Sequence, residues 1–134
     1  TELNCLLPAA VAMFTEEVGV SPLAHGGGGL YRARLAELIE RGRAFARIDD
    51  GRVVFKAEVA AVTEQVCQVQ GVWVDPRLRG HGHGTAGMAA VVALAAREIA
   101  PVVSLYVNDY NVPALAAYRS VGFTEVGAFM TVLF

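Results

Sequence analysis

The chain has 134 residues, of which 54% are apolar, and its formal net charge at pH 7 is −2. A chain of this length is most simply one domain with its own hydrophobic core. The mildly acidic balance argues against nucleic acid as the main partner. No uninterrupted apolar run approaches the roughly 18 residues of a membrane-spanning helix, so we expect no membrane partner. The two cysteines, Cys5 and Cys67, form no disulfide framework and predict a cytoplasmic protein with reduced thiols.

The N-terminal segment has neither the basic stretch nor the long apolar stretch of a signal peptide. It also lacks an initiating Met, so the predicted single domain, 1–134, can be a fragment of a longer chain. Residues 3–7 are short and apolar and predict an edge strand. Pro8 suits the first turn of a helix. Apolar residues at helical spacing then continue to Gly19, a residue type that often follows a helix.

A second helix is predicted after the glycine run at 26–29, which we expect to be a flexible connection. Tyr31, Leu35 and Ile39 share one helical face, and the charged residues of this segment lie largely outside it. Gly42 is expected to end the helix.

The middle of the chain predicts three antiparallel strands. Apolar residues dominate 44–48 and 53–59, and the Asp50-Gly51 pair between them is a strong hairpin signal. A further turn near residues 63–64 leads into a third strand over 65–74. The alternation of this strand breaks at Gln70-Gly71, where we expect a β-bulge.

The second half of the chain alternates helices and strands. A helix is predicted over 85–99, and the continuous apolar run at 102–107 suits a central strand. Strand, helix and strand in this order imply a right-handed crossover and a parallel pair. Asn111 is the expected N-cap of a further helix that ends at Gly122. A last strand region is expected over 123–134, so the element order predicts an α/β fold with a mixed sheet.

A glycine-rich turn joins the third strand to the helix that follows it. Its glycines, Gly80, Gly82 and Gly84, stand where backbone N–H groups and a helix dipole point at a phosphate. A P-loop needs a lysine, which this turn lacks. The letters Gly82-x-Gly84-x-x-Gly87 spell a dinucleotide fingerprint. However, the antiparallel hairpin upstream and the single βα unit downstream disagree with a dinucleotide-binding fold.

Two motifs in this half resemble those of the GNAT superfamily of N-acetyltransferases. The first is Arg79-Gly80-His81-Gly82-His83-Gly84, which resembles the [RQ]-x-x-G-x-[GA] signature and follows a V-x-V-x-P strand end at 72–76. The second is Asn111-x-x-Ala114-x-x-x-Tyr118-x-x-x-Gly122-Phe123, which matches a family motif without a gap. The whole chain also resembles the C-terminal domain of actinobacterial GNAT proteins that carry an extra N-terminal domain of unknown function.

The resemblance implies a fold and an acyl donor. The fold is the GNAT (acyl-CoA N-acyltransferase) fold, with a mixed, mostly antiparallel sheet, a splayed parallel strand pair and about four helices. The donor is acetyl-coenzyme A, its pyrophosphate on the glycine turn and its pantetheine arm along the edge of the third strand. The donor-binding residues implied in this way are Val72, Trp73, Val74, Arg79, Gly80, His81, Gly82, His83, Gly84, Thr85, Asn108, Asn111 and Tyr118.

The implied reaction moves the acetyl group to an amine acceptor by direct attack in a ternary complex. A backbone N–H near Val74 would stabilise the developing oxyanion. Tyr118 would protonate the departing thiolate as general acid. Several relatives carry a glutamate four residues before the first valine of the V-x-V pattern, and this chain has Gln68 there. Glutamine cannot take a proton.

The general base therefore stays open. Glu58, on the strand before Gln68, is the candidate that we assign, and a water chain is another. Glu16 and Glu17, near the end of the first helix, are further candidates. Because the first two helices line the acceptor site in relatives, these two residues are also predicted to bind a cationic acceptor.

Other functions compete with acetyl transfer. A non-catalytic acyl-CoA-binding or regulatory domain is the main alternative, because the usual glutamate is replaced. A dinucleotide-binding oxidoreductase is less favoured. A metal site at His81 and His83 is disfavoured because no third ligand lies at supporting spacing, so no metal is expected. The acceptor, a small molecule or a protein amine, is left open, and the resemblance allows a homodimer through the last strand.

Overall fold

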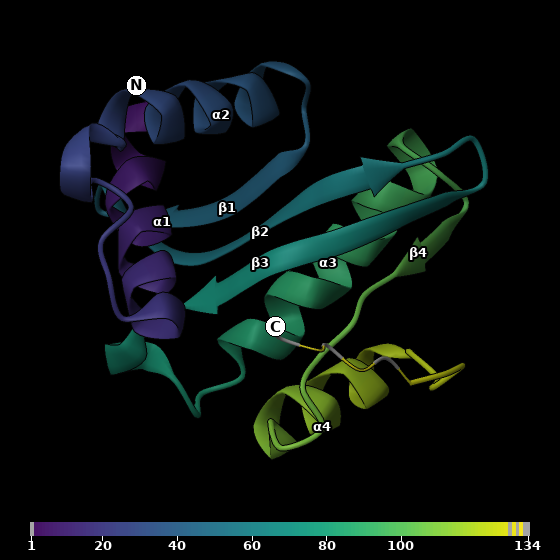
Figure 1. Cartoon of the computed structure of the whole chain (residues 1–134). Coiled ribbons are helices and arrows are strands. Elements are labelled where there is room, and N and C mark those ends of the chain that lie inside the picture. The colour runs from purple at the N-terminus through teal and green to yellow at the C-terminus, as the bar shows by residue number, and fades with distance from the viewer. Residues whose placement is uncertain (1, 129, 131, 133–134) are drawn as a thin grey trace.

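The computed structural model describes residues 2–128, 130 and 132, without the side chains at positions 2, 17, 18 and 25. The elements follow in the order helix, helix, three strands, helix, strand, helix (Figure 1). Their bounds are α1 Glu2–Val18, α2 Gly28–Glu40, β1 Ala44–Asp49, β2 Arg52–Val62, β3 Val66–Val74, α3 His83–Glu98, β4 Val102–Ser104 and α4 Val112–Val121, with short 3-10 turns η1 at Ala24–Gly26 and η2 at Pro76–Leu78.

The four strands form one sheet in the order β1-β2-β3-β4, covered by helices on both faces (Figure 1). The pairs β1–β2 and β2–β3 are antiparallel, and β3–β4 is parallel. Helices α1 and α2 pack on one face and α3 with α4 on the other. The predicted fold class is therefore confirmed: a mixed, mostly antiparallel sheet with one parallel pair and four α-helices among the described residues.

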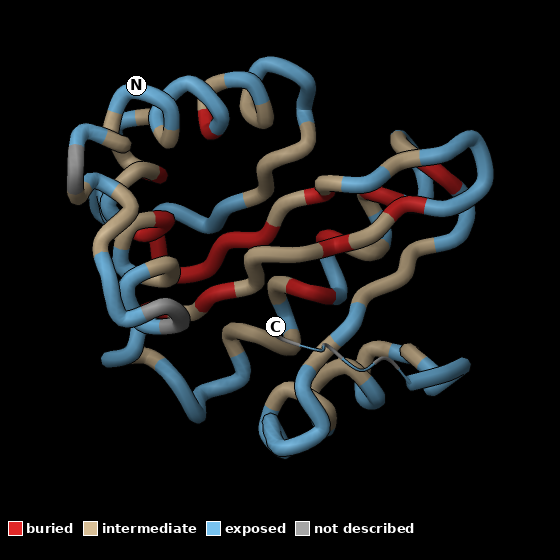
Figure 2. Tube along the Cα trace, in the orientation of Figure 1, coloured by how far each residue is buried: buried red, intermediate tan, exposed pale blue. Residues whose placement is uncertain are grey.

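The core on the α3 face is built from alternate residues of β2 and β3 and a stripe of α3 (Figure 2). Met88, Val91 and Ala95 recur on one side of α3 and are almost fully buried. Each large apolar side chain buried in this way contributes about 1.5–3 kcal/mol. A Cβ on Gly87 would lie 2.6 Å from the Phe55 ring, so Gly87 lets α3 approach the sheet closely. Gly87 therefore serves packing, which accounts for the last glycine of the misleading dinucleotide pattern.

The core on the α1 face corrects the prediction of an edge strand over 3–7. These residues belong to α1, whose Leu6, Ala9 and Ala10 are buried against Val53 and Trp73 of the sheet. Burial of this helical stripe outweighs the short apolar run that favoured a strand. Pro8 consequently lies inside α1 rather than in its first turn.

The predicted hairpin and bulge are both confirmed. Asp50 (φ 50°) and Gly51 (φ 74°) connect β1 to β2 with the positive φ angles of a type I′ turn. The β2–β3 register shifts between Lys56 and Glu58, which places a bulge at Gly71, where φ is 62°. The third strand ends at Val74, as predicted.

Three predictions about where segments begin, end or form a strand are wrong. The glycine run does not stay a flexible connection throughout, because α2 begins at Gly28. Strand β4 stops at Ser104 instead of residue 107, because the chain then leaves the sheet (Figure 1). The segment over 123–134 contains no strand where it is described, and residues 129, 131, 133 and 134 lie outside the described residues. Exposed apolar residues such as Val126 and Met130 made this segment resemble a strand in sequence.

Candidate functional site

The glycine turn leads from the end of β3 into the N-terminus of α3. Gly82 is the N-cap of α3 and has a φ of 83°, a left-handed conformation that side-chain-bearing residues rarely adopt. No side chain caps this helix end. The first N–H groups of an α-helix have no partner within the helix. The turn therefore presents backbone donors and the positive end of the helix dipole, which suits an anionic group.

The start of this turn is anchored by a buried carboxylate that is not among the site residues predicted from the sequence. Asp75 accepts hydrogen bonds from the backbone N–H of Arg77 at 3.0 Å and from the Arg77 guanidinium at 2.9 and 3.2 Å. Arg52 lies 3.5 Å away. Chiefly through the hydrogen bonds from Arg77, the pKa of Asp75 falls to about 2. Its signal in sequence is the Asp-Pro pair, which is typical of a capped turn.

Arg79 links the turn to the far end of α1. Its guanidinium donates to both oxygens of Glu16, at 2.7 and 2.9 Å, and its Nε donates to the Val74 carbonyl at 3.0 Å. The hydrogen bonds from Arg79 lower the pKa of Glu16. Both side chains are nearly half exposed, at 44% and 48%, so solvent screens the pair and limits its stabilisation to about 1 kcal/mol or less.

Trp73 lies beneath this ion pair, with its side chain in the α1-face core. Its indole also contributes weakly to lowering the pKa of Glu16. Its buried Nε1 nevertheless meets no hydrogen-bond acceptor among the described residues. We conclude that the indole lies near Glu16 without forming a hydrogen bond. The ring of Trp73 is therefore buried on the α1 face, opposite to the face on which Val72 and Val74 pack.

A gap opens between β3 and β4 just beside the turn. Only three residue pairs join the two strands, ending at Gln68 and Ser104, whose hydroxyl donates to the Cys67 carbonyl at 3.0 Å. From residue 69 to residue 74, β3 has no strand neighbour on that side within the described part of the chain. The predicted splay of the parallel pair is thus present. An extended ligand can hydrogen-bond to such an exposed strand edge.

Tyr118 comes from α4 and packs against the α3-face core, together with Val72 and Val74. Its ring meets Phe123 edge to face, with centroids 5.9 Å apart. Burial raises the pKa of Tyr118 above its usual 10. The phenol therefore keeps its proton at neutral pH, as a general acid must.

Asn108 and Asn111, both predicted to bind the cofactor, form side-chain hydrogen bonds within their own segments. The Asn111 side-chain oxygen accepts from the Ala114 N–H at 3.3 Å and caps α4, which confirms its predicted N-cap role. Asn108 donates to the Tyr110 hydroxyl at 2.9 Å. Contacts of either residue with a cofactor stay predictions.

Glu58 lies on the opposite face of the sheet from Tyr118. It is half-buried, accepts from Gln70 at 3.4 Å, and raises the pKa of Tyr31 on α2, although burial is the larger cause there. Beside it, Lys56 is buried and donates to the Gly71 carbonyl at 2.7 Å. Lys56 is not among the site residues predicted from the sequence. Its signal was a lone lysine within the apolar run of β2.

The remaining candidates are less informative. Glu17 belongs to α1, but its side chain is not described. His81 is exposed, and His83 is the first residue of α3. Among the described residues, no group of three or more His, Cys, Asp and Glu residues is arranged to hold a metal ion. Burial raises the pKa of the Cys67 thiol, which keeps it in its unreactive protonated form.

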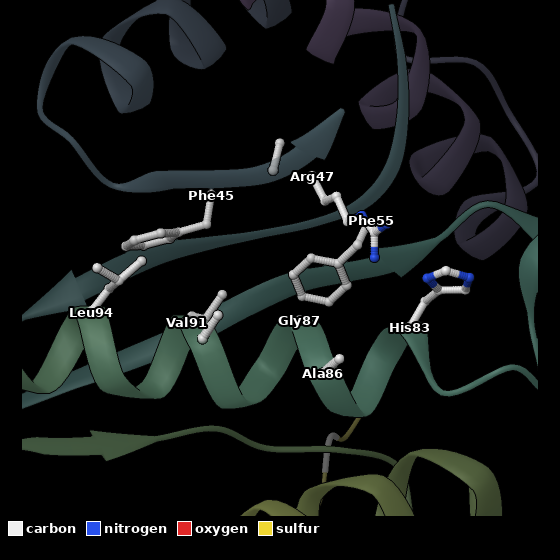
Figure 3. A pocket seen from close by; sticks show the side chains of 10 residues that line it. Phe45, Arg47, Phe55, His83, Ala86, Gly87, Val91 and Leu94 are labelled. Atoms are coloured by element: carbon white, nitrogen blue, oxygen red, sulfur yellow. The ribbon is translucent and has the colours of Figure 1, made fainter. Parts of the chain in front are cut away.

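Two cavities lie away from the gap. One of about 240 Å³ lies between β1 and α3, where Phe45, Phe55 and Leu94 gather, with Arg47 and His83 at one end (Figure 3). The other, of about 530 Å³, lies between α1 and the end of β3 and is lined by Trp73 and Asp75. Neither is lined by Tyr118 or Glu58. We therefore place the candidate site at the strand gap and the glycine turn, where the backbone hydrogen-bond donors are, rather than at the cavities.

Comparison with known proteins identifies the family of this chain. The model of the acetyltransferase (GNAT) family matches residues 12–123, which is most of the chain. A mycothiol acetyltransferase of Brachybacterium faecium is 35% identical over 77 residues, which are 58% of this chain and 23% of that protein. The chain thus spans about a quarter of the length of this curated relative.

Solved structures share the fold. A putative acetyltransferase from Agrobacterium tumefaciens has a TM-score of 0.74 at 17% identity, over 96% of this chain and 93% of that one. An aminoglycoside N-acetyltransferase in complex with CoA also has a TM-score of 0.74, at 15% identity, over 98% of this chain and 88% of that one. No described helix of this chain is long and apolar enough to cross a membrane.

Proposed function

We propose that this chain, which belongs to the acetyltransferase (GNAT) family, transfers the acetyl group of acetyl-coenzyme A to an amine in a ternary complex. The observation that carries the proposal is the junction of the glycine turn with the gap between β3 and β4. The turn offers backbone N–H donors for a pyrophosphate, and the adjoining edge of β3, which has no strand neighbour there, offers backbone groups to an extended amide-containing arm. The family match confirms the predicted class of enzyme, an acyltransferase.

We assign donor binding as follows. The backbone from Gly80 to Thr85 takes the pyrophosphate, supported by the left-handed Gly82 and the uncapped start of α3. The backbone of residues 72–74 pairs with the pantetheine arm. Asn108 and Asn111 approach from the other wall of the gap. Apart from Arg79 and Tyr118, these assignments cover the predicted donor-binding set, including His81, His83 and Gly84.

Arg79 needs a separate account, because its guanidinium is bound to Glu16. We propose that the pyrophosphate competes with Glu16 for Arg79 when the donor binds. Glu16 would then be released from Arg79 when the donor binds. The proposal that Glu16 and Glu17 bind a cationic acceptor therefore depends on this release. The pair is exposed enough for such an exchange to cost little.

The chemistry that this arrangement supports is direct acyl transfer. The amine nitrogen attacks the thioester carbonyl carbon, and a backbone N–H of β3 stabilises the oxyanion. When the C–S bond breaks, Tyr118 gives its proton to the departing thiolate sulfur. The ammonium proton leaves to Glu58 or to water. Tyr118 and Glu58 lie on opposite faces of the sheet, which supports separate routes for the leaving thiolate and the incoming amine.

Several finer statements are also proposals. The length of the mycothiol acetyltransferase relative supports a domain of a larger two-domain protein, as the sequence resemblance implies. The acceptor is an amine-bearing small molecule or protein. Relatives include enzymes named for mycothiol and for aminoglycosides, and both names are consistent with acetylation of amino groups. A cytoplasmic location and a homodimer stay predictions.

The proposal is tested in two stages. Calorimetry should show binding of acetyl-coenzyme A and of coenzyme A but not of NAD. A panel of polyamines, aminoglycosides, amino-sugar thiols and lysine peptides, read by release of free thiol, should then identify an acceptor. Binding without transfer to any amine would favour the non-catalytic acyl-CoA-binding alternative. Binding of NAD in place of coenzyme A would overturn both.

A further inference from the structure

Lys56 is a charged residue in an apolar place. It lies in the middle of β2 with 2% of its surface exposed, between Phe55 and Ala57, which belong to the α3-face core. A buried ammonium is costly unless it is hydrogen-bonded. Lys56 is paired across the sheet with Trp73, so its side chain lies on the α1 face, as that of Trp73 does. Lys56 also lies next to β3, the strand that borders the gap, so a role in the site is worth testing.

The ammonium of Lys56 holds the bulge of β3. Its Nζ donates to the Gly71 carbonyl at 2.7 Å. Gly71 has a φ of 62°, and a Cβ at this position would lie 2.9 Å from Glu58 Oε1 and 3.2 Å from Lys56 Nζ. The two charged groups thus converge on a residue that must be glycine. The contact fixes the peptide unit between Gly71 and Val72.

That peptide unit also carries the N–H of Val72. The chain has no cis peptide bond among its described residues, so this N–H points opposite to the Gly71 carbonyl. It is therefore directed away from the Lys56 ammonium. The carbonyl of Val74, two residues further along, faces away from β2, because the next residue, Asp75, donates its N–H to Val54 of β2 and the Val74 carbonyl accepts from Arg79. Backbone groups of residues two apart face the same side of a strand, so the Val72 N–H faces the side where β4 has left the sheet.

We propose that Lys56 is a positioning residue for acyl transfer: by holding the Gly71 carbonyl, it keeps the Val72 N–H aimed into the gap, where it polarises the thioester carbonyl of the donor. This inference rests on the proposed function, since it presupposes acetyl-coenzyme A in the gap. What it adds to the backbone oxyanion donor of the proposed function is a role for the buried lysine. Lys56 touches no reacting atom and acts through the Gly71–Val72 peptide.

The test uses the carbonyl stretch of bound acetyl-coenzyme A labelled with ¹³C at the acetyl carbonyl. In the wild-type protein, infrared difference spectra should show this stretch at a lower wavenumber than in free solution, because the Val72 N–H donates to the oxygen. Lys56→Met should abolish most of this displacement, while calorimetry finds the donor affinity within about twofold. Lys56→Arg, which keeps a cationic donor, should restore part of it. With an acceptor in hand, Lys56→Met should lower kcat at least about tenfold at similar KM.

Arg97→Met is the matched control, because it removes one positive charge from the exposed end of α3 and should leave the stretch unchanged. If Lys56→Met does not fold, amide NMR of the wild-type protein decides instead. The Val72 N–H resonance should move with acetyl-coenzyme A more than with coenzyme A, and equal movement overturns the inference. An unchanged carbonyl stretch in a folded Lys56→Met protein overturns it too. Failure of the wild-type protein to bind acetyl-coenzyme A at all would instead contradict the proposed function.

Discussion

Individual side chains near the strand gap divide into those that are free to do chemistry and those that hold the backbone in place. Tyr118 is half-buried with its hydroxyl protonated at neutral pH, and no described hydrogen bond engages it. Asp75, Arg77 and Lys56, by contrast, are committed to backbone or to one another. In the proposed mechanism, the chemistry therefore depends on few side chains and on a main chain held by hydrogen bonds.

Replacing Tyr118 with Phe should slow acetyl transfer about a hundredfold, because one general acid typically contributes two orders of magnitude or more. The affinity for acetyl-coenzyme A should hardly change, since the ring and its contact with Phe123 remain. Steady-state kinetics and calorimetry check the two halves. The wild-type rate should also fall as pH rises through the raised pKa of Tyr118, above 10, where the acid is lost. An unaffected kcat in the variant would remove Tyr118 from the mechanism.

Replacing Asp75 with Asn should make stability less sensitive to acid. The folded-state pKa of Asp75, about 2, lies below its usual 3.8, so its stabilising effect is fully present above about pH 4. That effect is lost as pH falls toward 2. Urea unfolding at pH 7 and at pH 3 should show a smaller loss of stability in the variant than in the wild-type protein. Equal losses of stability in the two proteins would show that the contact between Asp75 and Arg77 does not contribute to the pH dependence of folding.

At the scale of elements, two contacts near the glycine turn differ in how exposed they are. Arg79 ties it to the C-terminal part of α1, and the close approach of α3 to β2 at Gly87 sets the height of the helix above the sheet. The first contact is exposed and exchangeable, whereas the second is buried. Changes at the two places should therefore separate donor binding from stability.

Glu16→Gln should tighten binding of coenzyme A about two- to fivefold, which is the worth of an exposed ion pair that no longer competes for Arg79. Arg79→Met should weaken binding. Calorimetry at two salt concentrations measures both effects, and the gain in Glu16→Gln should shrink at high salt. Glu37→Gln, which breaks an exposed pair between α2 and its C-cap residue Arg41, is the control for the loss of one negative charge. Weaker binding in Glu16→Gln would mean that Arg79 needs Glu16 for its position.

Gly82→Ala and Gly87→Ala should have different effects although both add one methyl group. At Gly82 nothing lies within 4 Å of the new Cβ, but the left-handed φ costs about 1–2 kcal/mol and distorts the turn. Donor affinity should fall. At Gly87 the methyl group meets the Phe55 ring, so overpacking should cost about 1–3 kcal/mol of stability. Thermal unfolding and calorimetry on both variants test this contrast, which fails if Gly82→Ala binds coenzyme A normally.

At the scale of the whole molecule, donor binding should join parts that the sheet leaves apart. The gap separates β3 from the segment between β4 and α4, and an occupant of the gap would contact both. Acetyl-coenzyme A at about 100 times its Kd should therefore raise the free energy of unfolding by about 2.7 kcal/mol. Hydrogen exchange should slow at residues 72–85 and 108–118. NAD at equal concentration is the control, and protection by NAD alone would contradict the assignment of the turn.

Local signals in the sequence determined most of the elements. The Asp50-Gly51 hairpin, the break in alternation at Gly71, the Asn111 cap and the glycine turn all depend on preferences of a few neighbouring residues, and the structure has each of them. The two motifs likewise identified the family. Such features can be read along the chain because their physical cause is local.

The tertiary structure decided what depends on distant partners. Residues 3–7 are helical because Leu6 and its neighbours pack against Val53 and Trp73, and β4 is short because its partner strand diverges after Gln68. The engagement of Arg79 by Glu16 spans 63 positions, and the bulge that the sequence located is held by a lysine on another strand. Neither partner has a local signature, since cross-strand and helix–turn contacts arise only when the sheet is assembled. The sequence thus determined the glycine turn that we propose as the site of a phosphate-bearing donor, and the fold determined which residues hold that turn and the neighbouring bulge in shape.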